Sequence, residues 1–285
     1  MITYTLPDFT VGLGLNLHFA RLFVERPTWM QPNVRIASVY GCFPGCTLNG
    51  GRSYLRAQTS PVDIERTFAI LEEYGLVPRL TFTNMLATPA DLDSPYARCI
   101  LQSAARHGGE VIVYSDKVGR EIRRRYGMPL VLSTTRALED AQAVNNAMQS
   151  YDWVVLNYNH HKDSAFLRAL DQPKRAEVMV NEFCVRNCPH RQEHYLLNSQ
   201  DQRAGQQHPF ECVAKRADFF AHEPGHPITF TTEEVRQLNR EYGIEYFKIV
   251  GRGVPFATQL EALTYYLVRP EYRKTVKQQV ISLLR

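Results

Sequence analysis

From residue 34 onward the sequence alternates short runs rich in β-branched and aromatic residues with longer amphipathic stretches. Most of these runs are apolar at successive positions, so both faces of each predicted strand would be buried, as in a parallel sheet covered by helices. The runs that we interpret as strands are 34–40, 79–84, 110–115, 129–134, 152–158, 176–181, 227–232 and 246–251. Eight strand–helix units without an obvious break predict an α/β fold, a single (β/α)8 TIM-like barrel, with an open doubly wound sheet as the alternative.

The stretches between the runs have the pattern and the endings of crossover helices. Several finish at a glycine, as in "EYGL", "RHGG", "RYGM" and "EYGI", and glycine is common just beyond the last turn of a helix. We therefore expect one domain over residues 1–285. Within it, residues 1–33 would be an N-terminal extension, and residues 185–226 a long irregular insertion after the sixth strand.

The apolar runs, such as "VIVY" and "WVVL", are far too short to cross a bilayer. The amino terminus "MITYTLPDFT" lacks the basic start and apolar middle of a signal peptide. We therefore expect a cytoplasmic protein without a membrane span. The formal net charge is +4, and its one concentrated basic run is "GREIRRRYG" at 119–127. That run would either contact nucleic acid or another polyanion, or simply be solvated.

Polar residues gather where the predicted strands end. In a parallel barrel the carboxyl ends of all strands meet at one rim, and barrel enzymes carry their active sites there. Such residues follow most of the predicted strands: Asn84, Ser115, Asp116, Ser133, Thr134, Asn157, Asn159, Asn181, Glu182 and Arg252. Loops are polar in many proteins, so this pattern becomes specific only because cysteines fall at the same rim.

Five of the six cysteines lie in two predicted rim loops. The pair in "YGCFPGC" follows the first predicted strand, a second pair follows the sixth, and a fifth cysteine lies in the insertion: Cys42, Cys46, Cys184, Cys188 and Cys212. Cys99 lies on a predicted helix with apolar neighbours, where we expect a buried and inert thiol. In a reducing cytoplasm, clustered cysteines more often bind metal or act in catalysis than form disulfides.

The cysteine spacings allow more than one metal centre. Cysteines four residues apart on a helical turn have Cβ atoms about 5 to 6 Å apart, close enough to share one centre. Two such pairs would suit zinc, whereas an iron–sulfur cluster tolerates the long interval between Cys188 and Cys212. The C-x3-C-x2-C signature of radical SAM enzymes is absent after Cys46. A histidine is an alternative fourth ligand, and the candidates are His190, His194 and His208.

Three segments in the second half of the chain resemble the peptidase U32 family. They are "AEVMVNEFCVRNCPHR" at 176–191, "FECVAK" at 210–215 and "TFTTEEVRQLNREYGIEYFKIVGRG" at 229–253. The resemblance implies a TIM-barrel-like catalytic domain. It also implies a 4Fe-4S cluster, since several members of that family are iron–sulfur proteins of oxygen-independent hydroxylation, acting on a ubiquinone precursor or on RNA bases.

Carried onto this sequence, the resemblance makes Cys184 and Cys212 cluster ligands, and Cys188 takes the place of a cysteine that usually lies further on. The family's ligand near the seventh strand has no counterpart in "PITFTTEEV", so Cys42 or Cys46 becomes the candidate for the fourth ligand. The chain also stops soon after its last predicted helix, as in short family members that depend on a partner. A hetero-oligomer with a related subunit is therefore expected.

Three further residues are candidates for catalysis. Glu182, two residues before Cys184, is the candidate general acid or base. Lys248 and Arg252 belong to the Lys-Ile-x-Gly-Arg motif of the family, and Arg252 would hold a carboxylate or phosphate by paired hydrogen bonds. For Glu182 and Arg252 the alternative is a salt bridge at the rim.

We thus expect an oxidoreductase of the hydroxylase kind, acting on a small aromatic or RNA substrate. Two other functions remain open. One is a metal-dependent hydrolase or peptidase, with zinc as its metal, although the chain contains neither H-E-x-x-H nor G-x-S-x-G. The other is a non-catalytic partner or RNA-binding subunit with a structural cluster, which would place the basic run 119–127 on a phosphate backbone.

Overall fold

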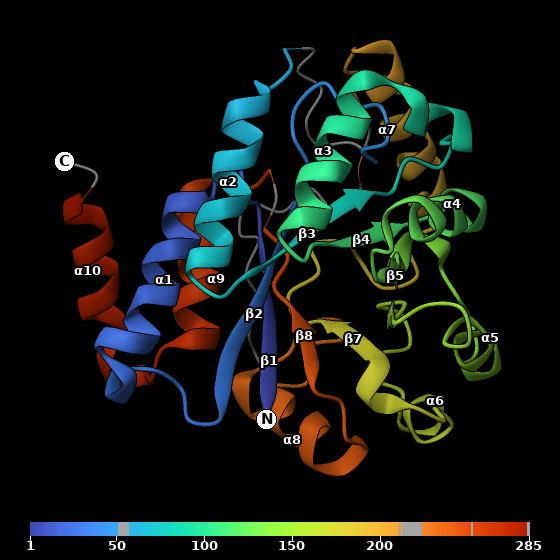
Figure 1. Ribbon diagram of the computed structural model, residues 1–285. Helices are drawn as coiled ribbons and strands as arrows, with labels where there is room; N and C mark the ends of the chain where they lie inside the picture. Colours follow the sequence, from blue (N-terminus) through green and yellow to red (C-terminus); the bar gives the residue numbers. More distant parts are fainter. Residues whose placement is uncertain (51–56, 211, 213–223, 252, 284–285) are drawn as a thin grey trace.

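In the computed structural model the strands close into a parallel barrel in the order β1-β2-β3-β4-β5-β6-β7-β8, which excludes the open sheet (Figure 1). The structure describes residues 1–50, 57–210, 212, 224–251 and 253–283. The strands are β1 Ile2–Pro7, β2 Val34–Gly41, β3 Val77–Phe82, β4 Glu110–Val113, β5 Leu130–Leu132, β6 Trp153–Val155, β7 Ala176–Met179 and β8 Tyr246–Lys248. The predicted (β/α)8 TIM-like barrel is confirmed.

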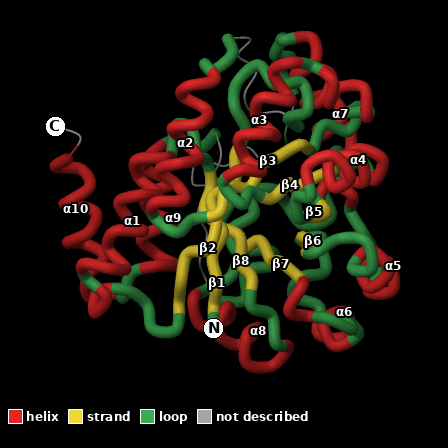
Figure 2. The backbone as a smooth tube through the Cα atoms, viewed as in Figure 1, coloured by secondary structure: helices red, strands yellow, loops and turns green. Residues whose placement is uncertain are grey.

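Helices surround the barrel, and the amino-terminal ends of the strands lie at the bottom of the view in Figure 2. The helices are α1 Leu13–Glu25, α2 Pro61–Glu73, α3 Pro95–Arg106, α4 Asp116–Tyr126, α5 Ala141–Ala147, α6 Ser164–Arg168, α7 Arg191–Ala204, α8 Thr232–Tyr242, α9 Phe256–Leu267 and α10 Arg273–Leu283. Within the described part of the chain, none of these helices is long and apolar enough to cross a membrane.

The first strand of the barrel lies in the segment expected to be an N-terminal extension. Residues Ile2–Pro7 form β1, which pairs with both β2 and β8 and so closes the barrel. In this strand Tyr4 and Leu6 belong to the apolar layer under the helices, whereas Thr5 faces polar partners inside the barrel. The extension predicted for residues 1–33 is therefore wrong, because those residues supply a complete strand–helix unit.

The predicted strand at 227–232 does not form. Its only β pairing among the described residues is a single antiparallel bridge between Asn181 and Thr229. Its apolar side chains are nevertheless buried, with Ile228 at 0% and Phe230 at 2% exposure. The side chains of this run are therefore buried, as its composition predicts, but among the described residues its backbone does not pair with a neighbouring barrel strand.

The insertion after β7 is more regular than expected. Residues Arg191–Ala204 form the helix α7, which ends at Gly205 with φ 61°. Glycine adopts this left-handed conformation without a Cβ penalty, so it suits the end of a helix. The first half of the insertion therefore contains a helix and is not irregular. The strand before the insertion, predicted as the sixth, is β7 of the barrel because β1 was not predicted.

Local sequence signals account for the starts of several crossover helices. Before α2, the hydroxyl of Ser60 accepts a hydrogen bond from the backbone N–H of Asp63, and Pro61 occupies the first turn. Before α8, Thr231 and Glu234 form a reciprocal capping box. These contacts satisfy N–H groups that have no partner within the helix.

The lower half of the barrel interior carries a buried charge network instead of the usual branched apolar layer. Arg79 on β3 lies 2.6 Å from Glu177 on β7 and 2.7 Å from Glu110 on β4. The hydroxyl of Thr5 donates to Glu177 at 2.6 Å. The side chains of Arg79 and Glu177 are 2% and 0% exposed, so this network joins strands across the barrel away from water.

Candidate active site at the barrel mouth

Helix α7 crosses the carboxyl-terminal mouth of the barrel. Its first turn is held beside the loops that follow β7 and β5. Arg191 Nη2 lies 2.9 Å from Glu182 Oε2, and Gln192 Nε2 donates to the carbonyl oxygen of Thr135 at 3.4 Å. These contacts fix the amino-terminal end of α7 on one side of the mouth.

The other end of α7 is held on the opposite side. Gln202 Nε2 donates to the carbonyl oxygen of Cys46 in the loop after β2, at 3.2 Å. The side chain of Asn84, in the loop after β3, donates to the carbonyl oxygen of Ser199 at 3.0 Å. Since β2 and β3 lie across the closed barrel from β6 and β7, the helix forms a ceiling over the mouth.

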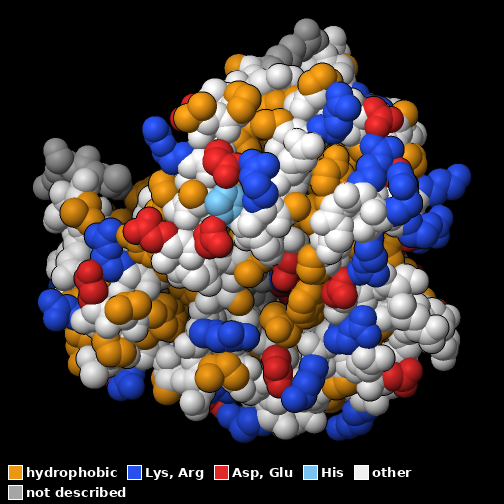
Figure 3. Space-filling view, viewed as in Figure 1, with side chains coloured by type: hydrophobic (Ala, Val, Ile, Leu, Met, Phe, Trp, Pro, Cys, Tyr) orange, Lys and Arg blue, Asp and Glu red, His pale blue; other side chains and the backbone are white. Residues whose placement is uncertain are grey.

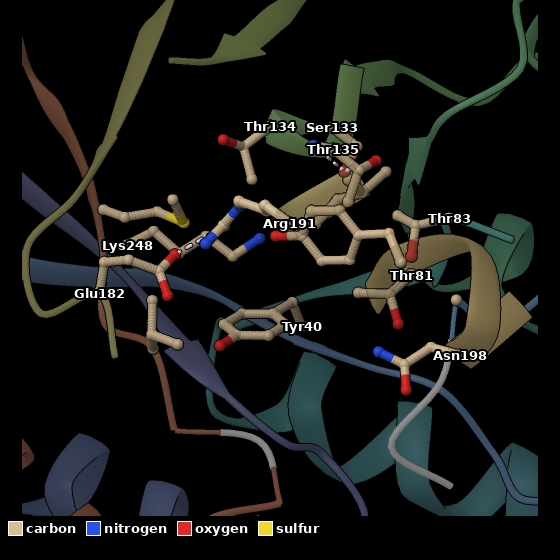
Figure 4. Close-up of a pocket in the computed structure, with 15 residues that line it drawn as sticks. Tyr40, Thr81, Thr83, Ser133, Thr134, Thr135, Glu182, Arg191, Asn198 and Lys248 are labelled. Atoms are coloured by element: carbon tan, nitrogen blue, oxygen red, sulfur yellow. Dashed lines mark hydrogen bonds and ion pairs between the residues drawn. The ribbon is translucent and has the colours of Figure 1, made fainter. Parts of the chain in front are cut away.

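Under this helix lies a cavity of about 90 Å³ that is lined by both polar and apolar side chains (Figure 4). Its walls come from strands and loops on all sides of the barrel and from α7. The lining residues are Tyr40, Gly50, Thr81, Thr83, Ile112, Ser133, Thr134, Thr135, Met179, Glu182, Arg191, Tyr195, Asn198, Lys248 and Val250. The cavity is smaller than the roughly 150 Å³ that accommodates benzene, so it holds a small molecule or one end of a larger one.

Arg191, the first residue of α7, projects into the middle of the cavity in Figure 4. Its guanidinium carbon lies 4.0 Å from the ring centre of Tyr158 and 4.9 Å from that of Tyr195, so two aromatic faces enclose the cation. Burial lowers the pKa of Arg191, but the attraction of the Glu182 carboxylate has the larger effect, and the pKa is raised. Arg191 therefore brings a permanent positive charge, and its side chain donates to Glu182 only among the described residues.

Two of the predicted catalytic residues lie in this cavity. Glu182, which is 5% exposed, pairs with Arg191, and its Oε1 accepts the backbone N–H groups of Phe183 at 2.8 Å and Cys184 at 3.2 Å. These contacts hold the carboxylate of Glu182 beside the guanidinium of Arg191, so Glu182 positions that cation in the cavity. Lys248, which is 8% exposed, has its Nζ 4.0 Å from the ring centre of Tyr40.

Two of the predicted cysteine ligands, Cys184 and Cys188, lie together beside this cavity, and Cys212 is near enough to act on Cys188 electrostatically. Burial raises the pKa of the Cys188 thiol, and the neighbouring Cys184 and Cys212 raise it further. Cys184 and Cys188 are within side-chain hydrogen-bonding distance of each other. Cys184 also contacts Tyr158, whose ring covers Arg191, so the thiols lie one aromatic side chain from the cavity.

The other cysteine pair lies at the far end of α7. The backbone oxygen of Cys188 accepts the N–H of Arg191, whereas that of Cys46 accepts from Gln202. Eleven residues of helix separate Arg191 from Gln202, which is about 16 Å at 1.5 Å per residue. Cys42 and Cys46 therefore lie apart from Cys184, and neither is brought to it as a fourth ligand.

The donor chemistry of Cys184, Cys188 and Cys212 fits an iron–sulfur cluster, which binds thiolates. Within the described ranges, no three His, Cys, Asp or Glu side chains converge closely enough to hold a metal ion as they stand. The candidate histidines have other partners: His190 meets Glu193 at 3.0 Å, His208 meets Asp201 at 2.5 Å, and His194 stacks on Phe210 at 4.4 Å. Binding a cluster would thus require the thiols to close around it.

Two further predictions concern basic residues. Arg252 lies outside the described residues. The basic run forms α4, on the side of the molecule where Figure 3 shows many lysine and arginine side chains. Three of its four arginines already meet carboxylates: Arg123 pairs with Asp152, Arg124 with Glu121, and Arg125 with Glu121 and Asp93. The run therefore has less free charge for a phosphate backbone than its composition indicates.

No family model matches the sequence, and no curated protein matches it either. The solved structure of the U32 peptidase Mk0906 matches with a TM-score of 0.55 over 90% of this chain and 94% of that chain, at 14% identity. The chain has the fold of a U32 peptidase. The fold and the resemblance of residues 176–253 thus agree, while an identity this low says nothing about activity.

The structure of the Bacillus cereus spore cortex-lytic enzyme SleL also aligns with the chain, at a TM-score of 0.42 and 13% identity, over 93% of this chain and 74% of that one. That score is too low to support a conclusion about function.

Sequence reasoning missed Arg191 and the aromatic residues around it. A signal was present, because Arg191 and Tyr195 are four residues apart and so share one face of a helix. The signal went unused because the insertion was expected to be irregular. Tyr40, inside the predicted first strand, gave no sign that its ring would meet Lys248, because the strand β1 that lies between β2 and β8 was not predicted.

Proposed function

We propose that this chain is a barrel-mouth enzyme that binds a small, oxygen-rich anion and uses an iron–sulfur cluster held by Cys184, Cys188 and Cys212. The proposed reaction class is oxygen-independent hydroxylation, or a related redox modification. One observation carries the proposal: Cys184 and Cys188 lie together, with Cys212 near them, one side chain away from a charged cavity at the carboxyl end of the strands.

The charges of the cavity favour a negatively charged ligand. Arg191 and Lys248 contribute two positive charges, and Glu182 contributes one negative charge. The hydroxyls of Thr83 and Ser133 in the wall can donate hydrogen bonds to oxygen atoms of the same ligand. The other wall hydroxyls already donate within the protein: Thr81, Thr134 and Thr135. A small carboxylate or a similar oxyanion suits this set, because a guanidinium and an ammonium group can hold it together.

The three thiolates would hold the cluster, which supplies one-electron chemistry when bound. Tyr158 lies between the thiols and Arg191, so it separates the cluster site from the ligand site while keeping them close. Glu182 is the proposed general acid or base, and uptake of a proton would weaken its ion pair with Arg191 and leave that cation to the ligand. Helix α7, which carries Arg191, limits the entry of water into the cavity.

The first test is to purify the protein without oxygen and to measure iron, sulfide and zinc per chain, together with the visible absorption spectrum. Wild type is compared with Cys184→Ala/Cys212→Ala. Cys99→Ala is the matched control, because Cys99 lies on α3 away from the other thiols. We expect about four irons and four sulfides per chain, lost in the double variant and kept in the control.

Zinc without iron would instead favour the hydrolase alternative. No metal after reconstitution with iron and sulfide would refute the cluster.

The ligand site is tested separately by titrating a panel of small carboxylates and measuring their binding by calorimetry. Arg191→Gln should weaken binding by about 10- to 100-fold, since a charge-assisted hydrogen bond contributes about 1.5–3 kcal/mol. The same anaerobic preparation, run on a sizing column, tests the predicted hetero-oligomer when co-expressed with a related subunit.

A further inference from the structure

The loop after β2 contains a second pair of thiols, Cys42 and Cys46, which the proposed cluster does not use. They are 4% and 2% exposed, and their side chains are hydrogen-bonded to each other. The loop is anchored by Phe43, whose ring centre lies 5.2 Å from that of Phe9 and 5.4 Å from that of Phe68. The two thiols are therefore held side by side by a packed apolar segment.

The sequence between the two cysteines explains why they meet. Pro44 and Gly45 form the turn of "CFPGC", and Gly45 has φ 74°. A proline followed by a residue with positive φ is the signature of a type II turn, which reverses the chain. Any side chain at Gly45 would strain this turn, so the glycine is what allows Cys46 to fold back on Cys42.

The two thiols are not equivalent. The Cys46 sulfur has Cys42 as a hydrogen-bond partner, and the S–H of Cys42 also points at the carbonyl oxygen of Phe43 at 3.5 Å. The backbone N–H groups of Leu48 and Asn49 lie near the Cys46 sulfur, and that of Asn49 donates to the carbonyl oxygen of Cys46 at 3.2 Å. These donors lower the pKa of Cys46 in spite of its burial. A thiol that is already polarised in this way is the one that attacks an oxidant, and a neighbouring thiol resolves the product.

We propose that Cys42 and Cys46 are a redox pair that a small peroxide converts to a reversible disulfide. The Cys46 sulfur attacks one peroxide oxygen, the O–O bond breaks, and Cys46 becomes a sulfenic acid while the other oxygen leaves as water or alcohol. The Cys42 sulfur then attacks Cys46, and the sulfenic oxygen leaves as water with the Cys42 proton. Two thiols are oxidised by two electrons, and one peroxide is reduced. Burial of both sulfurs favours an oxidant as small as hydrogen peroxide.

The pair is connected to the cavity. Gly50, at the end of the same loop, lines the cavity, and the carbonyl oxygen of Cys46 accepts the hydrogen bond from Gln202 on α7. Disulfide formation draws Cys46 towards Cys42, since the bond length is about 2.05 Å. Oxidation therefore moves both a wall and the ceiling of the cavity, and ligand affinity should change with it.

The test uses the full chain, reduced and purified without oxygen, then titrated with hydrogen peroxide and quenched with an alkylating reagent. Peptide mass spectrometry locates the disulfide. We expect a Cys42–Cys46 bond, reversed by dithiothreitol, that forms at least about tenfold faster than the oxidation of Cys99. In Cys42→Ser, Cys46 should stop at a sulfenic acid that dimedone traps, while the thermal melting profile shows that the variant is folded.

Two results would overturn the proposal. One is a pair that stays reduced while Cys99 reacts. The other is loss of iron from Cys42→Ser to the extent seen in Cys184→Ala/Cys212→Ala, which would make Cys42 a cluster ligand. Absence of iron in the wild type, with the disulfide still formed, would refute the cluster and leave the redox pair intact.

Discussion

The buried network inside the barrel predicts a large effect for Arg79→Met. Methionine keeps the unbranched apolar part of the side chain but removes the cation from Glu177, whose side chain is 0% exposed. Removing one partner of a buried ion pair costs about 3–5 kcal/mol, because the remaining charge is left buried and unpaired. At about 2–4 °C per kcal/mol for a chain of this size class, the melting temperature should fall by roughly 6–20 °C.

The same variant has a predicted pH dependence. In the wild type burial raises the pKa of Glu177, but the attraction of Arg79 outweighs it and the pKa is lowered. In Arg79→Met burial acts without that cation, so the carboxyl is penalised at neutral pH, where the unfolded chain is ionised. The deficit relative to wild type should be largest near about pH 7.5 and should shrink as the pH approaches about 4.3, where the unfolded glutamate also takes up a proton.

The assay is the thermal unfolding of both proteins, followed by circular dichroism at a series of pH values. Arg106→Met is the matched control, since Arg106 also pairs with a glutamate at 2.6 Å but is 60% exposed. An exposed pair contributes about 0–1 kcal/mol, so the control should melt within a few degrees of wild type. The reasoning is refuted if Arg79→Met behaves like this control, or if its deficit does not depend on pH. Adding Glu177→Gln should recover part of the loss.

Three smaller predictions follow from other contacts. Burial lowers the pKa of His107, but the hydrogen bonds of its two ring nitrogens with Glu72 and Glu65 have the larger effect, and the pKa is raised. The stabilising contribution of His107 should therefore be complete below about pH 6.5 and should be lost as the pH rises through the raised pKa. His107→Gln should therefore lower the melting temperature more at acidic than at alkaline pH. Thr231→Ala removes the cap of α8 and should cost about 1 kcal/mol in denaturant unfolding, against no change for an exposed serine in a loop. A Cβ at Gly50 would lie 2.2 Å from a threonine hydroxyl oxygen of the cavity wall, so Gly50→Ala should weaken carboxylate binding by about tenfold or more in calorimetry, and unchanged binding would contradict the described wall.

Periodicity predicted seven of the barrel strands and failed on the first. In Ile2–Pro7 apolar residues alternate with Thr3 and Thr5, which is the pattern of a strand with one wet face. Here the polar face turns inward, where Thr5 meets the buried charges. The run at 227–232 failed in the opposite way, because burial of Ile228 and Phe230 is satisfied by packing without a ladder. Local composition reports burial, whereas strand pairing depends on distant partners.

The site was predicted in part. Glu182 and the cysteines of the same loop could be predicted because they follow a strand, whose carboxyl end points to the mouth of the barrel. Lys248, the last residue of β8, was predicted from the Lys-Ile-x-Gly-Arg motif. The separation of Cys42 from Cys184 could not be found, because it depends on the length and direction of α7. The spacing of cysteines along the chain predicts which thiols are neighbours within one loop. It does not predict which loops lie close together in the fold.

Helix α7 covers the cavity, so the height of the cavity depends on this helix as well as on the barrel strands that form the walls. Its two ends rest on opposite sides of the mouth, through Arg191 at one side and Gln202 at the other, and the barrel strands make none of these contacts with their backbone ladders. Substitutions in this one helix can therefore change the position of α7 over the cavity without disturbing the hydrogen bonds between the barrel strands. A protein built in this way can acquire a new ligand by changing a single helix, while the residues that keep it folded stay the same.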